Sequence, residues 1–213
     1  MAKAGRTIKL PTFAIAELSK QQRSELESSF DAVVSSIDVA MRGGVCSVGL
    51  MFEIATAHWR RTISSHSVID SLARMEGDLS RAAPLKPPTK YKRDDLCGFW
   101  HFHFCDARFL ATNLRLEADS RPGSLAERLL PIFRECAGDC FEAAAGRILH
   151  QAVIGSYHHR AGRRALTGEC IVFDGLARHN YYQTLRLHDE DDVDVRQRID
   201  RYRECDAAMG RLG

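Results

Sequence analysis

The sequence predicts an α+β protein in which helices come first and a small antiparallel sheet with packed helices follows. Two patterns indicate this class. Apolar residues recur at helical spacing through the first 80 residues. Two later stretches instead alternate between apolar and polar side chains, as strands do. A loop rich in Pro and Lys separates the two patterns. We therefore expect an N-terminal helical region at 1–83 and an α+β domain at 84–213, with one continuous domain as the alternative.

The composition is that of an ordinary globular protein. Of 213 residues, 45% are hydrophobic and 27% are charged, and the formal net charge is +2. Such a chain can bury a core, and its low net charge excludes a polycation. It contains no signal-peptide core and no apolar run near the roughly 20 residues that span a bilayer. With seven cysteines that form no tight pairs, the sequence predicts a cytoplasmic protein with reduced thiols and no membrane partner.

Three helices are expected in the N-terminal region. The stretch 19–41 is amphipathic, with apolar residues on one face. The stretch 48–63 is a more apolar helix, and 67–79 is a shorter one with Ser67 as its N-cap. We expect this region to bind a protein partner, such as an antitoxin, a second copy of the chain or another component of a defence system.

The segment GFWHFHF raises the central question about function. On a strand, Trp100, Phe102 and Phe104 would share one face, and His101 and His103 would share the other. Alternate residues of a strand project roughly 6.5 to 7 Å apart. Two imidazoles so placed can act as an acid–base pair on one substrate, or bind a metal ion together with a further ligand. Histidines that only form hydrogen bonds inside a core are the alternative.

The middle and the end of the chain are expected to be mostly helical. The stretches 106–118 and 124–155 have helical character, and a basic loop follows them. The acidic stretch 189–194 leads into a charged helix at 193–209, and its carboxylates suit the positive N-terminal end of that helix.

The clearest β signal is a hairpin. Two strand-like runs, 168–175 and 178–188, flank a turn that contains Gly175. On the second run, simple alternation places Tyr181, Leu185 and Leu187 on one face. The other face would then carry groups able to do chemistry: Asn180, Tyr182, Thr184, Arg186 and His188. The alternative is that this face is polar only because it is exposed to solvent.

Metal-free RNA cleavage needs a general base, a cation near the phosphate and a general acid. Glu169 can supply the base, Arg178 or Arg186 the cation, and His188 the acid. Histidine can fill either proton-transfer role because its reference pKa is about 6.5. The sequence contains no P-loop, Rossmann fingerprint, nucleophile elbow or HExxH motif, which disfavours the common nucleotide-binding and hydrolase classes.

Basic loops could contact the phosphate backbone of a nucleic acid, with Tyr182 stacking on an unpaired base. Solvated surface is the alternative explanation for these charges. The candidate contacts are Lys90, Lys92, Arg93, Arg160, Arg163 and Arg164.

Residues 85–200 resemble a family of uncharacterised bacterial and prophage-borne proteins, through the segments GFWHFHF, TGECIVFDG and HNYYQTLRLHDEDD. This resemblance implies a mobile-element or defence context. The order of helices, antiparallel sheet, glutamate, arginine and histidine is also similar to the barnase–EndoU–colicin–RelE group of ribonucleases. That similarity implies catalytic roles for Glu169, Arg178 or Arg186, and His188. The GFWHFHF strand departs from the barnase pattern.

These observations favour a metal-independent ribonuclease of toxin or anti-phage defence type that needs no cofactor and acts on RNA or another nucleic acid. His101, His103 and His188 would transfer protons. The first alternative is a non-enzymatic regulator or inhibitor, from a phage or mobile element, that binds nucleic acid or protein. The second is a histidine-ligated metalloenzyme.

Overall fold

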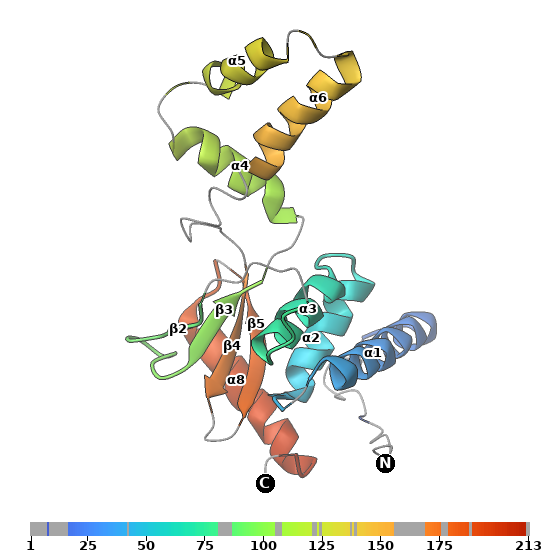
Figure 1. Cartoon of the computed structure of the whole chain (residues 1–213). Helices are drawn as coiled ribbons and strands as arrows, with labels where there is room; N and C mark the ends of the chain where they lie inside the picture. Colours follow the sequence, from blue (N-terminus) through green and yellow to red (C-terminus); the bar gives the residue numbers. More distant parts are fainter. Residues whose placement is uncertain are drawn as a thin grey trace. The chain divides into compact units, whose positions relative to one another are not determined.

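The computed structural model describes most of the chain in two units. The described residues are 8, 17–41, 43–80, 87–104, 108–120, 123, 125–136, 138, 140–155, 169–175, 179–187 and 189–211. Unit 1 comprises residues 1–106 and 168–213, and unit 2 comprises residues 107–167. Helices at the N-terminal end precede most of the strands, and these strands pair mainly antiparallel (Figure 1), which confirms the α+β class. Among the described helices, none has the length and apolar character that crossing a membrane requires.

Three N-terminal helices form as the sequence predicts. Helix α1 (Lys20–Ala40) begins with a capping box between Ser19 and Gln22. Helix α2 (Val48–Trp59) and helix α3 (Ser65–Met75) follow. The predicted cap of α3 is wrong.

Ser64, rather than Ser67, is the N-cap of α3. The Ser64 side chain accepts a hydrogen bond from the Ser67 backbone N–H at 3.4 Å. The Ser64 hydroxyl satisfies one of the backbone N–H groups that the first turn of a helix leaves unpaired. The helix therefore begins about one turn earlier than its apolar periodicity indicates.

A five-stranded sheet forms the centre of unit 1, in the order β1-β5-β4-β3-β2. Strands β3 and β4 pair antiparallel, as do β4 and β5, which confirms the hairpin. Strand β1 pairs with β5 in parallel and makes the sheet mixed. The bounds are β1 Val45–Cys46, β2 Thr89–Lys90, β3 Trp100–His103, β4 Cys170–Gly175 and β5 Asn180–Arg186.

A bulge in β5 changes which of its side chains share a face. Phe173 pairs with Tyr182 but Val172 pairs with Thr184, so Gln183 is an extra residue in β5. Tyr182 and Leu185 therefore join the same hydrophobic core, although simple alternation places them on opposite faces. The predicted division of β5 into two alternating faces is wrong beyond Gln183, because a bulge shifts the alternation by one residue.

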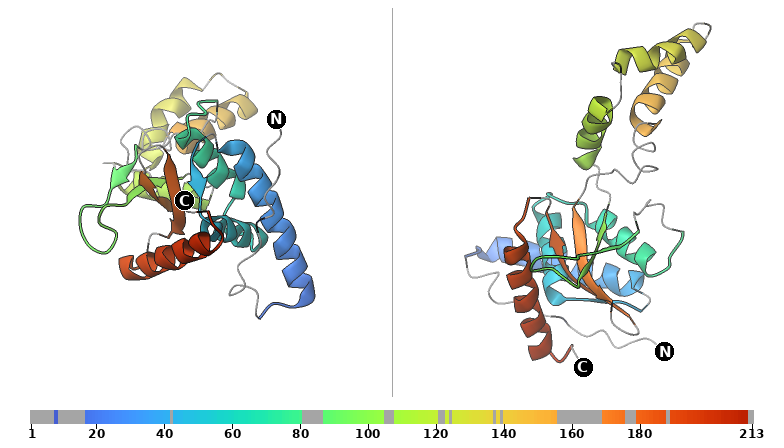
Figure 2. Two further views of the ribbon diagram at one scale, coloured as in Figure 1. Left: turned by 90° about the horizontal axis from the view of Figure 1, so that it is seen from below. Right: turned by 90° about the vertical axis from the view of Figure 1, so that its left-hand side faces the viewer.

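Helices cover both faces of the sheet. Helices α1, α2 and α3 share one core with Phe102 of β3 and with Phe104, which directly follows that strand. Helix α8 (Asp192–Ala208) packs on the other face, where Val195 and Ile199 form a second cluster with Val172. Figure 2 shows α8 on the side of the sheet opposite α2 and α3. The N-terminal helices and the later strands thus contribute to one hydrophobic core.

Helices α2 and α8 also approach each other directly. The ring of Tyr202 on α8 lies over Gly49 on α2, and a Cβ added at Gly49 would be 2.0 Å from the Tyr202 Cγ. Only glycine allows this approach, because real Cβ atoms do not come so near another atom. This contact fixes α8 against α2 and, through α2, against the edge of the sheet.

Unit 2 is helical, in agreement with the prediction for this stretch. It contains α4 (Arg108–Ser120), α5 (Leu125–Glu135), α6 (Phe141–Leu149) and a π-helical segment, η2 (His150–Gly155). Helix α5 contacts both α6 and η2.

Candidate active site

His101 and His103 lie together on the face of the sheet that α8 covers. Both are half-buried, and their ring centroids are 5.5 Å apart in an edge-to-face arrangement. Between them in sequence, Phe102 is fully buried in the opposite core. The GFWHFHF segment is therefore apolar on the face that packs against α1, α2 and α3 and carries titratable groups on the face toward α8, as the alternation predicts.

The register of the sheet aligns these histidines with groups on β4 and β5. His103 pairs with Cys170, and Cys170 pairs with Arg186. Neighbouring strands are about 4.8 Å apart, so the backbones of His103 and Arg186 are separated by roughly 10 Å. Long side chains can span that distance. The two histidines of β3 and the arginine of β5 thus share one face of the sheet, with Cys170 of β4 between them.

Tyr91 connects the histidine pair to Arg186. Its ring centroid is 4.4 Å from that of His101, and its hydroxyl accepts a hydrogen bond of 2.8 Å from Arg186 Nη1. The Arg186 guanidinium also lies 5.5 Å from the centroid of the Tyr91 ring, a cation–π distance. Burial raises the pKa of the Tyr91 phenol, so this hydroxyl stays protonated at neutral pH.

The charge of Arg186 is already engaged within the chain. Its Nη2 lies 2.5 Å from Oδ1 of Asp192, in the first turn of α8, and 3.3 Å from the carbonyl oxygen of Glu190. Arg186 keeps 21% of its side chain exposed. A phosphate at this position would therefore meet a cation that has a carboxylate partner beside it.

A second cluster of polar side chains, centred on Glu53, lies along the part of β5 that β1 does not pair with. The Glu53 carboxylate of α2 accepts hydrogen bonds from the Leu185 backbone N–H at 2.7 Å and from Thr184 Oγ1 at 2.8 Å. The Tyr202 hydroxyl donates to it at 3.1 Å, and Arg198 Nε lies 3.0 Å away. Strand β1 pairs only with Tyr181 and Tyr182, so beyond them side chains take the place of a further strand.

The environment of Glu53 also changes its proton affinity. Burial raises the pKa of Glu53 to about 7, because desolvation outweighs the opposing effects of Arg198 and the hydrogen-bond donors. Arg198 also forms a two-pronged pair with Glu190, at 2.8 and 2.9 Å. Glu53 is not among the residues that the sequence predicts for a site. Its only signal is a single carboxylate within the apolar run VGLMFEIATA.

The other predicted catalytic residues are placed as follows. Glu169 is buried, and its backbone carbonyl accepts a hydrogen bond of 3.2 Å from the Phe104 N–H. It directly precedes Cys170, whose thiol pKa is raised to about 11 by burial. Arg178 and His188 lie outside the described residues.

The predicted nucleic-acid contacts differ in accessibility. Lys90, Lys92 and Arg93 are exposed beside β3, and Lys90 Nζ lies 5.8 Å from the Trp100 ring centroid. Tyr182 is fully buried, and its hydroxyl donates to Glu76 Oε1 at 2.6 Å, so its ring cannot stack on a base in this conformation. The other predicted basic contacts lie outside the described residues: Arg160, Arg163 and Arg164.

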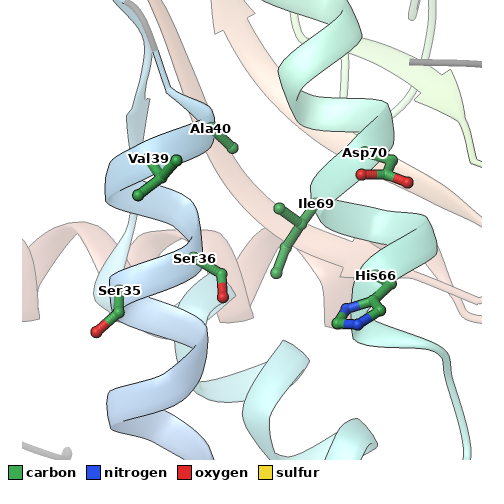
Figure 3. A pocket seen from close by; sticks show the side chains of 7 residues that line it. All are labelled: Ser35, Ser36, Val39, Ala40, His66, Ile69 and Asp70. Atoms are coloured by element: carbon green, nitrogen blue, oxygen red, sulfur yellow. The ribbon is translucent and has the colours of Figure 1, made fainter. Parts of the chain in front are cut away.

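Unit 1 also has a groove between α1 and α3 (Figure 3). It has a volume of about 490 Å³ and lies beside His66, Asp70 and the exposed Val39. The hydroxyls of Ser35 and Ser36 in its wall donate to carbonyls one turn back in α1, at 2.9 and 2.8 Å. Because these hydroxyls are bonded within their own helix, the groove offers no activated nucleophile.

Within the part of the chain that the structure describes, no group of three or more His, Cys, Asp or Glu side chains could hold a metal ion. Comparisons of the chain with protein-family models, curated proteins and solved structures found no match.

Proposed function

We propose that the chain is a metal-independent ribonuclease of toxin or anti-phage defence type, with His101 and His103 as its acid–base pair. One observation carries the proposal. Two half-buried imidazoles, with ring centroids 5.5 Å apart, share a face of the sheet with Arg186. Paired proton-transfer groups near a cation are the minimum that cleavage by the ribose 2′-hydroxyl requires.

The proposed step needs one neutral and one protonated imidazole. The neutral ring accepts the proton of the 2′-hydroxyl while the 2′-oxygen attacks phosphorus. The imidazolium gives its proton to the 5′-oxygen as the bond between phosphorus and that oxygen breaks. The products are a 2′,3′-cyclic phosphate and a free 5′-hydroxyl, and the same two groups can serve both oxygens because they lie close together.

Arg186 and Tyr91 support this assignment. Arg186 would offset the charge that develops on the phosphate oxygens, and Tyr91 holds both the ring of His101 and the guanidinium of Arg186. Exposed Lys90, Lys92 and Arg93 would attract the RNA backbone. Asp94 and Asp95 follow directly and offset part of that attraction.

A second candidate function is non-enzymatic binding of a nucleic acid or protein, as a phage regulator or inhibitor would do. The pairing of Arg186 with Asp192 favours it, because a catalytic cation is of most use when its charge faces the substrate. Under this alternative, changes to the histidines would alter affinity or stability, and no turnover would be lost.

The two candidates separate in a cleavage assay on total cellular RNA. Purified wild type and the double variant His101→Ala/His103→Ala would each be tested with and without EDTA, and melting curves would establish that both are folded. Cleavage by wild type alone, unchanged by EDTA, supports the ribonuclease. Loss of cleavage with EDTA favours a histidine-ligated metalloenzyme. The absence of cleavage under every condition refutes the ribonuclease and favours the binding protein.

A further inference from the structure

Unit 2 leaves much of its apolar surface uncovered. Among its described side chains, only Glu117 and Cys136 are less than a tenth exposed. Leu130 and Phe133 on α5 are 45% and 53% exposed, and Leu149 on α6 is 63% exposed. Large apolar side chains gathered on one face commonly mark an interaction surface.

The exposed apolar residues of α5 form a stripe. Ala126, Leu130 and Phe133 are exposed and follow one another at spacings of four and three residues, so they share one face of the helix. The neighbouring face carries the half-buried Ile132 and the buried Cys136 just beyond the helix end. Helix α5 also contacts α6 (Figure 1), yet the stripe of Ala126, Leu130 and Phe133 stays exposed.

Two opposite charges flank the stripe on the same side. Glu127 and Arg134 are seven residues apart, which is close to two full turns, so both lie along one border of the stripe. They are separated by about 10 Å along the helix axis, too far to pair with each other. In an antiparallel pair of helices, each border faces the same border of the partner.

We propose that the stripe on α5 binds the same stripe on a second copy of this chain, with the two α5 helices antiparallel. A two-fold axis near Leu130 and Pro131 would place Glu127 of each copy opposite Arg134 of the other copy. Apolar side chains would then face apolar side chains and opposite charges would face each other, so the interface would be self-complementary, as two-fold symmetry requires. This inference is independent of the proposed ribonuclease site in unit 1.

The charge pattern yields a specific test on the full-length chain. Sedimentation equilibrium is expected to show a dimer for wild type. Glu127→Arg and Arg134→Glu should each weaken dimerisation by roughly tenfold or more, since each places like charges together twice in a symmetric dimer. Leu130→Glu combined with Phe133→Glu should abolish the dimer while the circular dichroism spectrum is kept.

Compensation then identifies the partner. The double variant Glu127→Arg/Arg134→Glu should recover the dimer, and a mixture of the two single variants should form a heterodimer, because their charges are complementary. Unfolding or binding to another kind of protein cannot produce this recovery. A wild-type chain that stays monomeric at about 100 µM would overturn the inference, as would single charge reversals that leave dimerisation unchanged or a failure of both compensating combinations.

Discussion

The guanidinium of Arg186 lies 2.5 Å from the carboxylate of Asp192, between the end of β5 and the first turn of α8. This ion pair holds the most central cation of the candidate site. It therefore determines how much positive charge a bound phosphate would meet.

Removing the carboxylate of Asp192 is expected to strengthen RNA binding. Asp192→Asn leaves Arg186 its hydrogen bond to Tyr91 but removes the opposing charge, so affinity for single-stranded RNA should rise several-fold at low salt. Fluorescence anisotropy at a series of salt concentrations measures the effect. The control is Asp200→Asn, which makes the same change of charge at a residue paired with Arg196 on the exposed side of α8. Equal effects of the two variants would count against a role for Arg186.

The histidine pair gives a sharper expectation. His101→Gln and His103→Gln should each reduce the RNA cleavage rate by about 10²- to 10⁴-fold, the usual contribution of a general acid or base. Cleavage by wild type should follow a bell-shaped pH profile, because one imidazole must be neutral and the other protonated. His66→Gln, at an exposed histidine of α3, is the matched control and should retain full activity.

Stability measurements can test whether the two faces of β3 differ as the structure indicates. Phe102→Ala removes a fully buried ring and should lower the free energy of unfolding by about 3 to 5 kcal/mol. His103→Ala, one residue away on the half-exposed face, should cost far less. Urea denaturation measures both. If the two variants are equally destabilised, His103 is a core residue and its catalytic assignment fails.

Glu53 should make stability depend on pH in a defined direction. Its pKa is about 7 in the folded chain, above the ordinary value of 4.5, so the folded state binds the proton more tightly. The resulting stabilisation is fully present below about pH 4.5 and is lost as the pH rises through about 7. Relative to Glu53→Gln, which does not titrate, wild type should lose up to about 3 kcal/mol between pH 5 and pH 8.

Urea denaturation of wild type and Glu53→Gln at four pH values between 5 and 8 checks this expectation. Glu27→Gln, at an exposed position on α1, provides the control for a change of charge without burial. A difference between wild type and Glu53→Gln that stays constant or grows with pH would contradict the raised pKa.

The sequence predicts local features of this fold well where one short pattern decides them. The faces of GFWHFHF follow from alternation alone, because β3 is regular and one of its faces is apolar. The faces of β5 cannot be predicted in this way, because the bulge at Gln183 shifts the alternation and the residue types around it do not indicate a bulge. The two-residue strand β1 is too short for any periodic pattern to indicate.

Long-range contacts of the site are beyond such patterns. Glu53 meets Thr184 and Arg198 across more than a hundred residues of sequence, and only the packing of α2 and α8 brings them together. The buried Tyr182 shows the same limit. Its polar neighbours on the strand suggest a surface position, yet Glu76 at the C-terminal end of α3 accepts its hydroxyl hydrogen. Burial of a polar group depends on a partner that the local sequence does not reveal.

The central claim is that His101 and His103 promote cleavage of RNA by the 2′-hydroxyl of the RNA itself. The most direct measurement is ³¹P NMR of the products formed from a single-stranded oligoribonucleotide, beside an all-deoxy oligonucleotide of the same sequence. We predict a 2′,3′-cyclic phosphate signal from the RNA, produced equally in EDTA and absent with His101→Gln, and no cleavage of the DNA. Cleavage of the DNA, or products from RNA that carry a 5′-phosphate, would contradict the account.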